Sequence, residues 1–420
     1  MDQKSKGAWI IHHSQKLEGS QYEPTYGNLL QAGKAGILLS ALARSDESTL
    51  SADDVSAHAT ALRINPLELP TIITHLTKTK LIDTSEGGSV RVLGVAQSTV
   101  LIHTASLFQQ MEPHSEEEAI IEFAEQTSNS PIIETEASEY LGDNFSLSKD
   151  EVKELFNDTQ HYGFTDTEQV DSSNRIYFNG NLFRKNEVDK ISRALSALNQ
   201  ADQLKVTSLN ELLKKRGCLP EDDVTTILGQ DLFERLHGVG LFDVGVVTNS
   251  EGEARFITRP AAFGKFGDPF ADDALDLAKA FVACLTYGMT RRNAAQGRIS
   301  SLKHLMKHLV EGRTIGPATA IGEDYKILEL KGVVQITPGP SNRFYMKLLK
   351  KDIGELALQV LTEGETSDQA LPNFPGSAAS NYQRPEQQRV FSRQRIRNKP
   401  LNKKSQTNVL MALRTGGVFR

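Results

Sequence analysis

Residues 328–349, LELKGVVQITPGPSNRFYMKLL, contain two runs of strand-forming residues separated by a turn rich in Pro, Gly, Ser and Asn. This pattern predicts a β-hairpin, because β-branched and aromatic residues fit a pleated strand and the turn residues favour tight backbone geometry. The same order recurs upstream, at residues 75–95, 159–180 and 234–260. The four turns are centred near Gly87, Ser173, Gly252 and Gly339. Because the repeat is about 80–90 residues, the size of a small domain, the sequence predicts four related units.

Three helical segments are predicted upstream of each hairpin. In the first unit they cover residues 33–45, 51–62 and 65–79. Ser51 is a suitable N-cap, since its hydroxyl can accept a hydrogen bond from the first helical turn. Pro70 lies inside the last of these segments, so we expect that helix to start near Pro70 rather than Pro66.

Helix boundaries in the later units follow from similar signals. Ser148 with Glu151 has the spacing of a capping box before an apolar run. Ser208 with Glu211 is expected to open a helix that Gly217 closes. In the fourth unit, apolar residues spaced three and four apart predict an amphipathic helix. They are Leu302, Leu305, Met306, Leu309 and Val310.

Three helices followed by a hairpin is the order of elements in the winged helix-turn-helix superfamily. Residues 61–83, ALRINPLELPTIITHLTKTKLID, resemble its turn, third helix and first wing strand. The resemblance covers about residues 30–350, four times over, and implies an α+β, mainly helical chain of tandem modules, each with three helices and a β-hairpin wing. Module boundaries are then expected at residues 1–105, 106–184, 185–265 and 266–363, with 364–420 as a disordered basic tail. The alternative is a generic α+β protein whose hairpins recur by chance.

Composition places the chain among globular proteins with several small domains. It has 420 residues, of which 39% are hydrophobic and 24% charged. No apolar run is long enough for a membrane span, and the first residues lack the apolar core and cleavage site of a secretory signal. With two cysteines only, Cys218 and Cys284, a disulfide framework is not expected. A reducing compartment is favoured, so we expect a cytoplasmic protein, or a nucleoid or nuclear one if it binds DNA.

Charge is distributed unevenly along the chain. Residues 1–180 hold 12 Lys and Arg against 27 Asp and Glu, whereas residues 366–420 hold 10 against 2. The residues between them are close to neutral. An acidic first half repels nucleic acid and a basic end attracts it, so the net charge of −6 conceals a polarity that bears on function.

The usual catalytic motifs are missing, and a non-catalytic protein without cofactor or metal is predicted. GKAGILLS lacks the ending of a Walker A loop, and GVGLFDVG lies in a hairpin rather than at the start of a helix. The adjacent His12 and His13 are expected to be surface residues that point apart. His304 and His308 have the helical spacing at which two imidazoles can share a metal. Lysines beside both of them favour a cationic helix face instead.

The distribution of basic residues predicts where nucleic acid would bind. The expected recognition helices of the second and third units, SKDEVKELFNDTQ and PEDDVTTILGQDLFERL, are acidic and would repel phosphates. Residues 290–313 are the most basic part of the folded region, and an arginine also begins the second strand of each hairpin, at Arg91, Arg175, Arg255 and Arg343. The predicted nucleic-acid-binding residues are Arg291, Arg292, Arg298, Lys303, Lys307, Arg313, Arg343, Arg393, Arg395 and Arg397.

Two functions lead at this point, and an enzyme whose site is formed in a cleft between modules is a weaker third alternative. The first is a DNA-binding protein or subunit that holds phosphates with the fourth module and the basic tail, while acidic modules one to three contact a protein partner or a second copy. The alternative is a protein-interaction scaffold that never touches nucleic acid. The tail itself is either an arm for phosphate backbones or a solubilising segment without a specific partner.

Overall fold

The computed structural model describes residues 1–18, 24–45, 49–169, 175–183, 187–249, 252–266 and 272–371. This part of the chain is α+β and mainly helical, with several small antiparallel sheets, as the sequence predicted. None of its helices is both long and apolar enough to cross a bilayer.

One order of elements, helix–strand–helix–helix–strand–strand, recurs along the chain. Unit one has α2 (Gly27–Ala43), a bridge at Leu50, α3 (Ala52–Ala61), α4 (Leu69–Lys78), β1 (Ile82–Thr84) and β2 (Val90–Val92). Unit two has α6 (Ser115–Asn129), β3 (Ile132–Ile133), α7 (Glu134–Phe145), α8 (Lys149–Tyr162), β4 (Asp166–Gln169) and β5 (Arg175–Phe178). Unit three has α10 (Gln200–Arg216), β6 (Leu219–Pro220), α11 (Glu221–Leu228), α12 (Gln230–Gly238), β7 (Asp243–Asn249) and β8 (Gly252–Thr258). Unit four has α15 (Leu302–Val310), β9 (Ile315–Ala318), α16 (Ile321–Asp324), α17 (Lys326–Leu330), β10 (Val334–Pro338) and β11 (Phe344–Leu348).

Each hairpin predicted from the sequence is present, and its second strand also pairs with a short strand from earlier in the unit. The central strand of the three-stranded sheets is β5, β8 or β11. In unit one the corresponding contact is a single bridge between Leu50 and Val90. This extra strand was not predicted, because two to four residues between helices carry no periodic signal.

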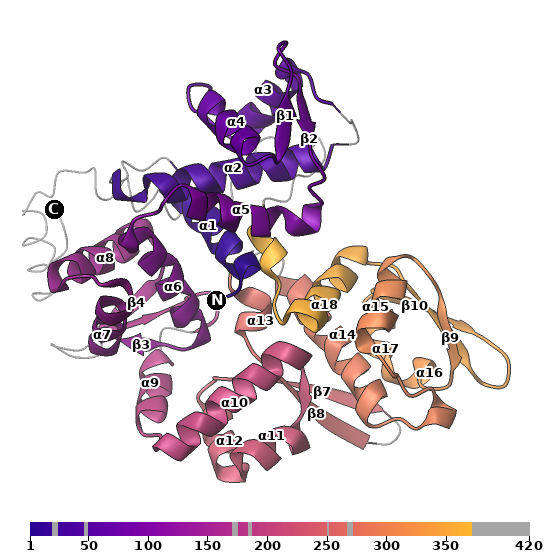
Figure 1. Ribbon diagram of the computed structural model, residues 1–420. Helices are drawn as coiled ribbons and strands as arrows, with labels where there is room; N and C mark the ends of the chain where they lie inside the picture. The colour runs from indigo at the N-terminus through magenta and orange to yellow at the C-terminus, as the bar shows by residue number, and fades with distance from the viewer. Residues whose placement is uncertain are drawn as a thin grey trace, which may run out of the picture.

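In the described residues, six more α-helices precede, connect or follow the units. They are α1 (Gln3–Leu17), α5 (Val100–Gln110), α9 (Val188–Ser196), α13 (Ala261–Gly264), α14 (Asp272–Thr290) and α18 (Lys351–Glu363). Figure 1 shows the four units arranged around the N-terminal end of α1. The helix α14 packs against β7 of unit three and against α18, which in turn contacts α15, so it joins units three and four.

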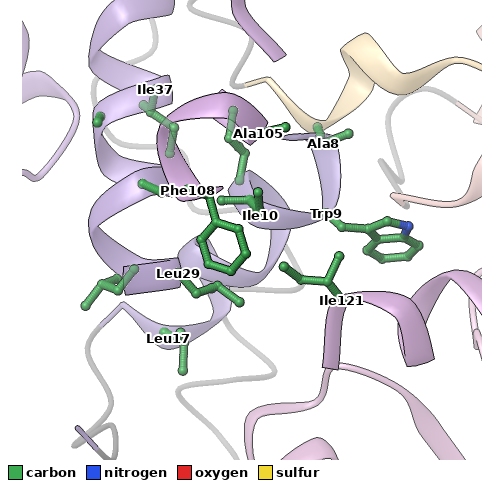
Figure 2. Close-up of a cluster of buried hydrophobic side chains, with 14 of the residues drawn as sticks. Ala8, Trp9, Ile10, Leu17, Leu29, Ile37, Ala105, Phe108 and Ile121 are labelled. Carbon is green, nitrogen blue, oxygen red and sulfur yellow. The ribbon is translucent and has the colours of Figure 1, made fainter. Parts of the chain in front are cut away.

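The core of the first unit forms where α1, α2 and α5 pack together. Figure 2 shows Ile10, Leu29 and Phe108 gathered between these helices with Ile121 of α6 nearby, while the Trp9 ring points away from them. All five side chains are fully buried or nearly so. Close approach depends on small residues: a Cβ built on Gly7 would lie 1.9 Å from the Leu101 carbonyl oxygen of α5. The helices therefore meet with almost no space between their backbones.

We expect the Gly7→Ala variant to lose about 1–3 kcal/mol of unfolding free energy, the usual cost of overpacking. The clash is with backbone, which cannot swing aside as a flexible side chain would. Chemical denaturation followed by circular dichroism measures the loss. The control is Gly27→Ala at the start of α2, where no atom lies within 4 Å of the added Cβ. That change should be neutral or slightly stabilising, because alanine favours the helix. Equal stability of both variants would contradict the close packing of α1 on α5.

A buried ion cluster joins segments that are far apart in sequence. The Nζ atom of Lys265 lies 2.7 Å from Glu125 Oε2 of α6 and 2.5 Å from Glu365 Oε2. Trp9 Nε1 donates to Glu125 Oε2 at 2.8 Å, and Ser5 Oγ donates to Glu365. Burial alone would raise the pKa of Glu125, but the adjoining ammonium of Lys265 and the Trp9 N–H donor hold it below its usual value. The cluster is therefore charged and internally paired, and it connects α1, unit two, the end of α13 and the segment after α18.

Several details of the sequence prediction are confirmed. Ser51 and Ser148 cap their helices in complete capping boxes. The third helix of unit one begins at Leu69 with Pro70 in its first turn, so the later start is right. In unit four, α15 buries Leu302, Met306 and Leu309 on its predicted apolar face.

Other details are wrong. The helix expected to open at Ser208 starts at Gln200, because the Asn199 side chain caps it by accepting from the Asp202 amide. The expected recognition helix of unit three is two helices, since Gly229 at φ +84° breaks it between α11 and α12. His12 and His13 are buried rather than exposed, among Trp9, Phe164 and Phe266. Burial lowers the pKa of His13 well below its usual value.

The boundary of the predicted tail also needs correction. Residues 364–371 pack on the folded part instead of belonging to a disordered tail, and Glu365, Thr366 and Ser367 are buried. Lys4 of α1 forms ion pairs with Glu363 and Asp368, at 2.8 and 2.9 Å. Residues 364–371 are held in place by polar side chains. Their polar composition is also typical of a linker, so the sequence alone predicted a disordered tail here. The rest of the predicted tail, residues 372–420, lies outside the described residues.

Candidate nucleic-acid interface

A groove between units three and four is lined by five basic residues. It has a volume of about 720 Å³ and lies between the end of α10, the start of α11, the end of α14 and the start of α15. Its basic residues are Lys215, Arg216, Arg291, Arg298 and Lys303, and its acidic residues are Asp222 and Asp223. We call this set the basic groove. Five cations against two carboxylates leave it positively charged, which favours an anionic ligand.

Local structure explains why the cations meet here. Lys215 and Arg216 occupy the last turn of α10, where cations offset the negative end of the helix dipole. Gly217 then turns the chain in a left-handed conformation, with φ +76°. From the other side, Arg291 follows the last residue of α14, and Lys303 lies in the first turn of α15. The groove is thus formed by helix ends that face one another.

Some of the groove's charge is already neutralised within the protein. Arg291 pairs with Asp222, and Arg216 lies 4.0 Å from Asp223. These side chains are about half exposed, so the pairs are weakly held and open to exchange with another anion. Arg298 donates to the Met289 carbonyl oxygen at 3.0 Å. Lys215 and Lys303 are exposed and form no ion pair with any residue that the structure describes.

The N-terminus of α15 adds a second source of positive potential. Ser301, Leu302 and Lys303 of this nine-residue helix line the basic groove. Ser301 caps the helix by accepting a hydrogen bond from the His304 amide. Free backbone N–H groups at a helix start attract phosphate oxygens, and Lys303 adds a full charge at the same place.

Apart from Arg292, the predicted residues separate into three groups. Arg291, Arg298 and Lys303 come together in the basic groove. Lys307, Arg313 and Arg343 are exposed but do not line it, and Arg313 pairs with Glu311 at 3.2 Å. Arg393, Arg395 and Arg397 lie outside the described residues.

Arg292 is unsuited to any external ligand. Its side chain is 1% exposed, and its guanidinium lies 2.6 Å from Asp324 Oδ1 and 2.7 Å from Glu323 Oε2 of α16. This pair joins the end of α14 to α16 inside unit four. The prediction that Arg292 contacts nucleic acid is therefore not supported by its position.

Lys215 and Arg216 were not singled out from the sequence. In the sequence, the run LLKKRG was predicted only to be the end of a helix that Gly217 closes. The fold brings this end opposite residues 291–303, about 80 residues later in the chain. Charge clustering along the sequence cannot reveal a neighbour at that separation.

The third helices of the units differ in the surfaces that they present. On α8 of unit two, Glu151 and Glu154 are exposed and line a separate hollow of about 330 Å³ with Glu116 and Asp158. On α17 of unit four, Ile327 and Leu330 are 49% and 83% exposed. Neither surface suits a phosphate backbone, since one is acidic and the other apolar. In unit one, Thr71, Thr74 and Lys78 of α4 are exposed and are compatible with nucleic acid.

Three of the four hairpin arginines already have a carboxylate partner. Arg91 lies 3.5 Å from Asp83, Arg175 lies 3.6 Å from Glu134 and Arg255 lies 2.6 Å from Glu221. Arg343 is exposed and forms no ion pair within the described part of the chain. Among the four hairpin arginines, Arg343 is therefore the one best suited to contact a phosphate.

The histidine pair of α15 lies at the surface of unit four. The rings of His304 and His308 are 4.3 Å apart between centroids. Across the residues that the structure describes, no group of three or more His, Cys, Asp or Glu side chains is placed to hold a metal ion.

A comparison with protein-family models finds none that matches the chain, and a comparison with curated proteins finds no significant similarity.

Proposed function

We propose that the chain is a non-catalytic DNA-binding protein, or the DNA-binding subunit of a complex, built from four winged-helix modules. The repeated order of elements supports the modules: each unit has three helices, and in units two to four the second hairpin strand is the central strand of a three-stranded sheet. In this proposal unit four, Arg343 and the basic tail hold phosphates. The observation that carries it is the convergence of five cations in the basic groove.

The mode of binding differs from that of a single helix-turn-helix module. In such modules the third helix enters the major groove. Here α17 has only five residues and exposes apolar side chains, so it is a poor reader of base edges. The basic groove instead offers side-chain cations and the N-terminus of α15, which contact phosphates without regard to sequence. We therefore expect binding that depends strongly on salt and weakly on base sequence.

The test is duplex binding by the full chain at two salt concentrations. A Lys215→Glu, Arg298→Glu, Lys303→Glu variant should bind about 100-fold more weakly at low salt, because three phosphate contacts become repulsions. The slope of log affinity against log salt should also become shallower by about 3. A matched control carries the same charge change at exposed positions outside the groove: Lys153→Glu, Lys190→Glu and Lys331→Glu. Equal affinity of the two variants would remove the basic groove from the proposal.

The second candidate is a protein-interaction scaffold without nucleic-acid binding. It is favoured by the exposed carboxylates of α8 and by Ile327 and Leu330 on α17, since both surfaces suit protein partners better than phosphates. Absence of measurable binding to duplex or single strands at low salt, with the protein folded, would favour this function.

A further inference from the structure

The edge strand of unit three has an open side. β7 pairs with β8 over residues 243–249, and the described residues form no backbone hydrogen bond with its other edge. Its sequence, DVGVVTN, contains none of the Lys, Arg or Pro residues that commonly protect an edge strand. Gly245, Val246 and Thr248 are exposed. A seven-residue edge of this kind is a template for one more strand.

A second groove runs along this edge and is distinct from the basic groove. It has a volume of about 590 Å³ and lies between β7, α14, α16 and α17, and Figure 1 shows α14 passing beside β7. Six consecutive residues of β7, 243–248, line it, so backbone as well as side chains faces the space. We call it the β7 groove.

The surface of the β7 groove is apolar with a mainly acidic rim. Ala280 and Ala283 of α14 form a flat floor, and Val246 and Ile327 are about half exposed beside it. Four carboxylates line the rim against two lysines: they are Asp243, Asp276, Glu323 and Asp324, opposite Lys279 and Lys326. Asp243 and Asp276 pair with Lys279, while Glu323 and the fully buried Asp324 pair with Arg292. With Arg292 included, four carboxylates face three cations, so a small negative excess remains. The surface therefore fits an extended apolar segment that carries positive charge.

We infer that the occupant is a segment of the same chain, residues 408–414, NVLMALR. It is the longest apolar run after Leu371, and the chain from residue 366 onward is strongly basic. In an extended strand Val409, Met411 and Leu413 share one face, which fits the alanine floor of α14. Arg414 follows the apolar run and complements the acidic rim. Backbone hydrogen bonds to β7 supply the affinity.

The tether between the folded part and this segment is long enough. About 36 residues separate Leu371 from Asn408. A random coil of that length spans on the order of 33 Å, and a fully extended chain spans more than 100 Å. Such a tether holds the segment at an effective concentration of order millimolar, so a weak interaction suffices for occupancy. This inference does not rest on nucleic-acid binding.

Amide hydrogen exchange of the full chain tests the docking. We expect the β7 amides, residues 243–249, to exchange at least tenfold faster in a Val409→Asp, Met411→Asp, Leu413→Asp variant than in the wild type. A Val246→Asp variant in the groove should show the same increase, and combining the two sets should add nothing further. Adding a synthetic peptide of residues 404–416 to the tail variant should restore slow exchange.

The matched control is Val418→Asp, Phe419→Asp, which changes apolar residues of the same tail outside the docking segment. It should leave exchange at β7 unchanged. The inference is overturned if the tail variant exchanges at β7 like the wild type. It is also overturned if protection depends on protein concentration instead, because the occupant would then be a second copy.

Discussion

Lys265→Met should lower the free energy of unfolding by about 3–5 kcal/mol, the usual effect of removing one partner from a buried ion pair. The change removes the ammonium that pairs directly with both Glu125 and Glu365 in the interior, and leaves the more distant Arg259 as their buried cation. Burial alone would lower the pKa of Lys265, but the two carboxylates raise it above its ordinary value, so the ammonium is charged in the folded protein. Denaturation in guanidinium, read by tryptophan fluorescence, measures the effect because Trp9 donates to Glu125.

Two further variants separate buried charge from lost packing. Adding Glu125→Gln and Glu365→Gln to Lys265→Met removes the uncompensated charges and should recover at least half of the loss. Lys351→Met, which breaks an exposed pair with Glu355, should cost less than about 1 kcal/mol. A Lys265→Met variant as stable as Lys351→Met would mean that the cluster does not hold the units together.

Arg292→Met should also lose about 3–5 kcal/mol, because Asp324 is then left buried without its cation. The carboxylate of Asp324 is fully buried and would keep only the donation from Asn249 Nδ2, at 3.0 Å, among the contacts described here. Thermal and denaturant unfolding of the full chain measure the loss.

The neighbouring arginine provides the control. Arg291→Met removes a pair in which both side chains are about half exposed or more, so it should change stability by less than about 1 kcal/mol. If the groove proposal is right, Arg291→Met weakens duplex binding while remaining stable. Similar stability of the two variants would contradict the buried position of Arg292.

The hairpins could be predicted from the sequence because strand-forming residues and turn residues alternate over short distances. In unit four, for example, Phe344 to Leu348 pair with Val334 to Pro338 across the Pro-Gly-Pro-Ser-Asn turn. The helix start at Ser148 was predicted correctly because a capping box marks it. The start of α10 was predicted wrongly because two polar residues could each serve as its N-cap. Asn199 and Ser208 are each followed three residues later by an acidic residue, so either could begin the helix. In the structure Val206 and Leu209 are buried on the same helix, α10, which therefore begins after Asn199.

The site was less accessible to sequence reasoning because its pairs are long-range. Arg291 and Arg292 are adjacent and chemically identical, yet one faces a groove and the other is buried against Asp324. The side on which a side chain points after a helix ends depends on the turn that follows. Lys215 and Lys303 likewise meet only because α14 and α18 bring units three and four together.

The buried cluster around Lys265 has a consequence for synthesis of the chain. α1 is synthesised long before residue 365, so Ser5 finds its acceptor only when Glu365 has been made. The N-terminal helix must therefore stay partly uncovered until nearly all of the described chain has emerged. Contacts between residues so far apart in the sequence slow folding. Until they form, apolar surface stays exposed and can be bound by chaperones. Although the fold consists of four consecutive units, the contact that forms last is therefore the one between α1 and the segment after α18.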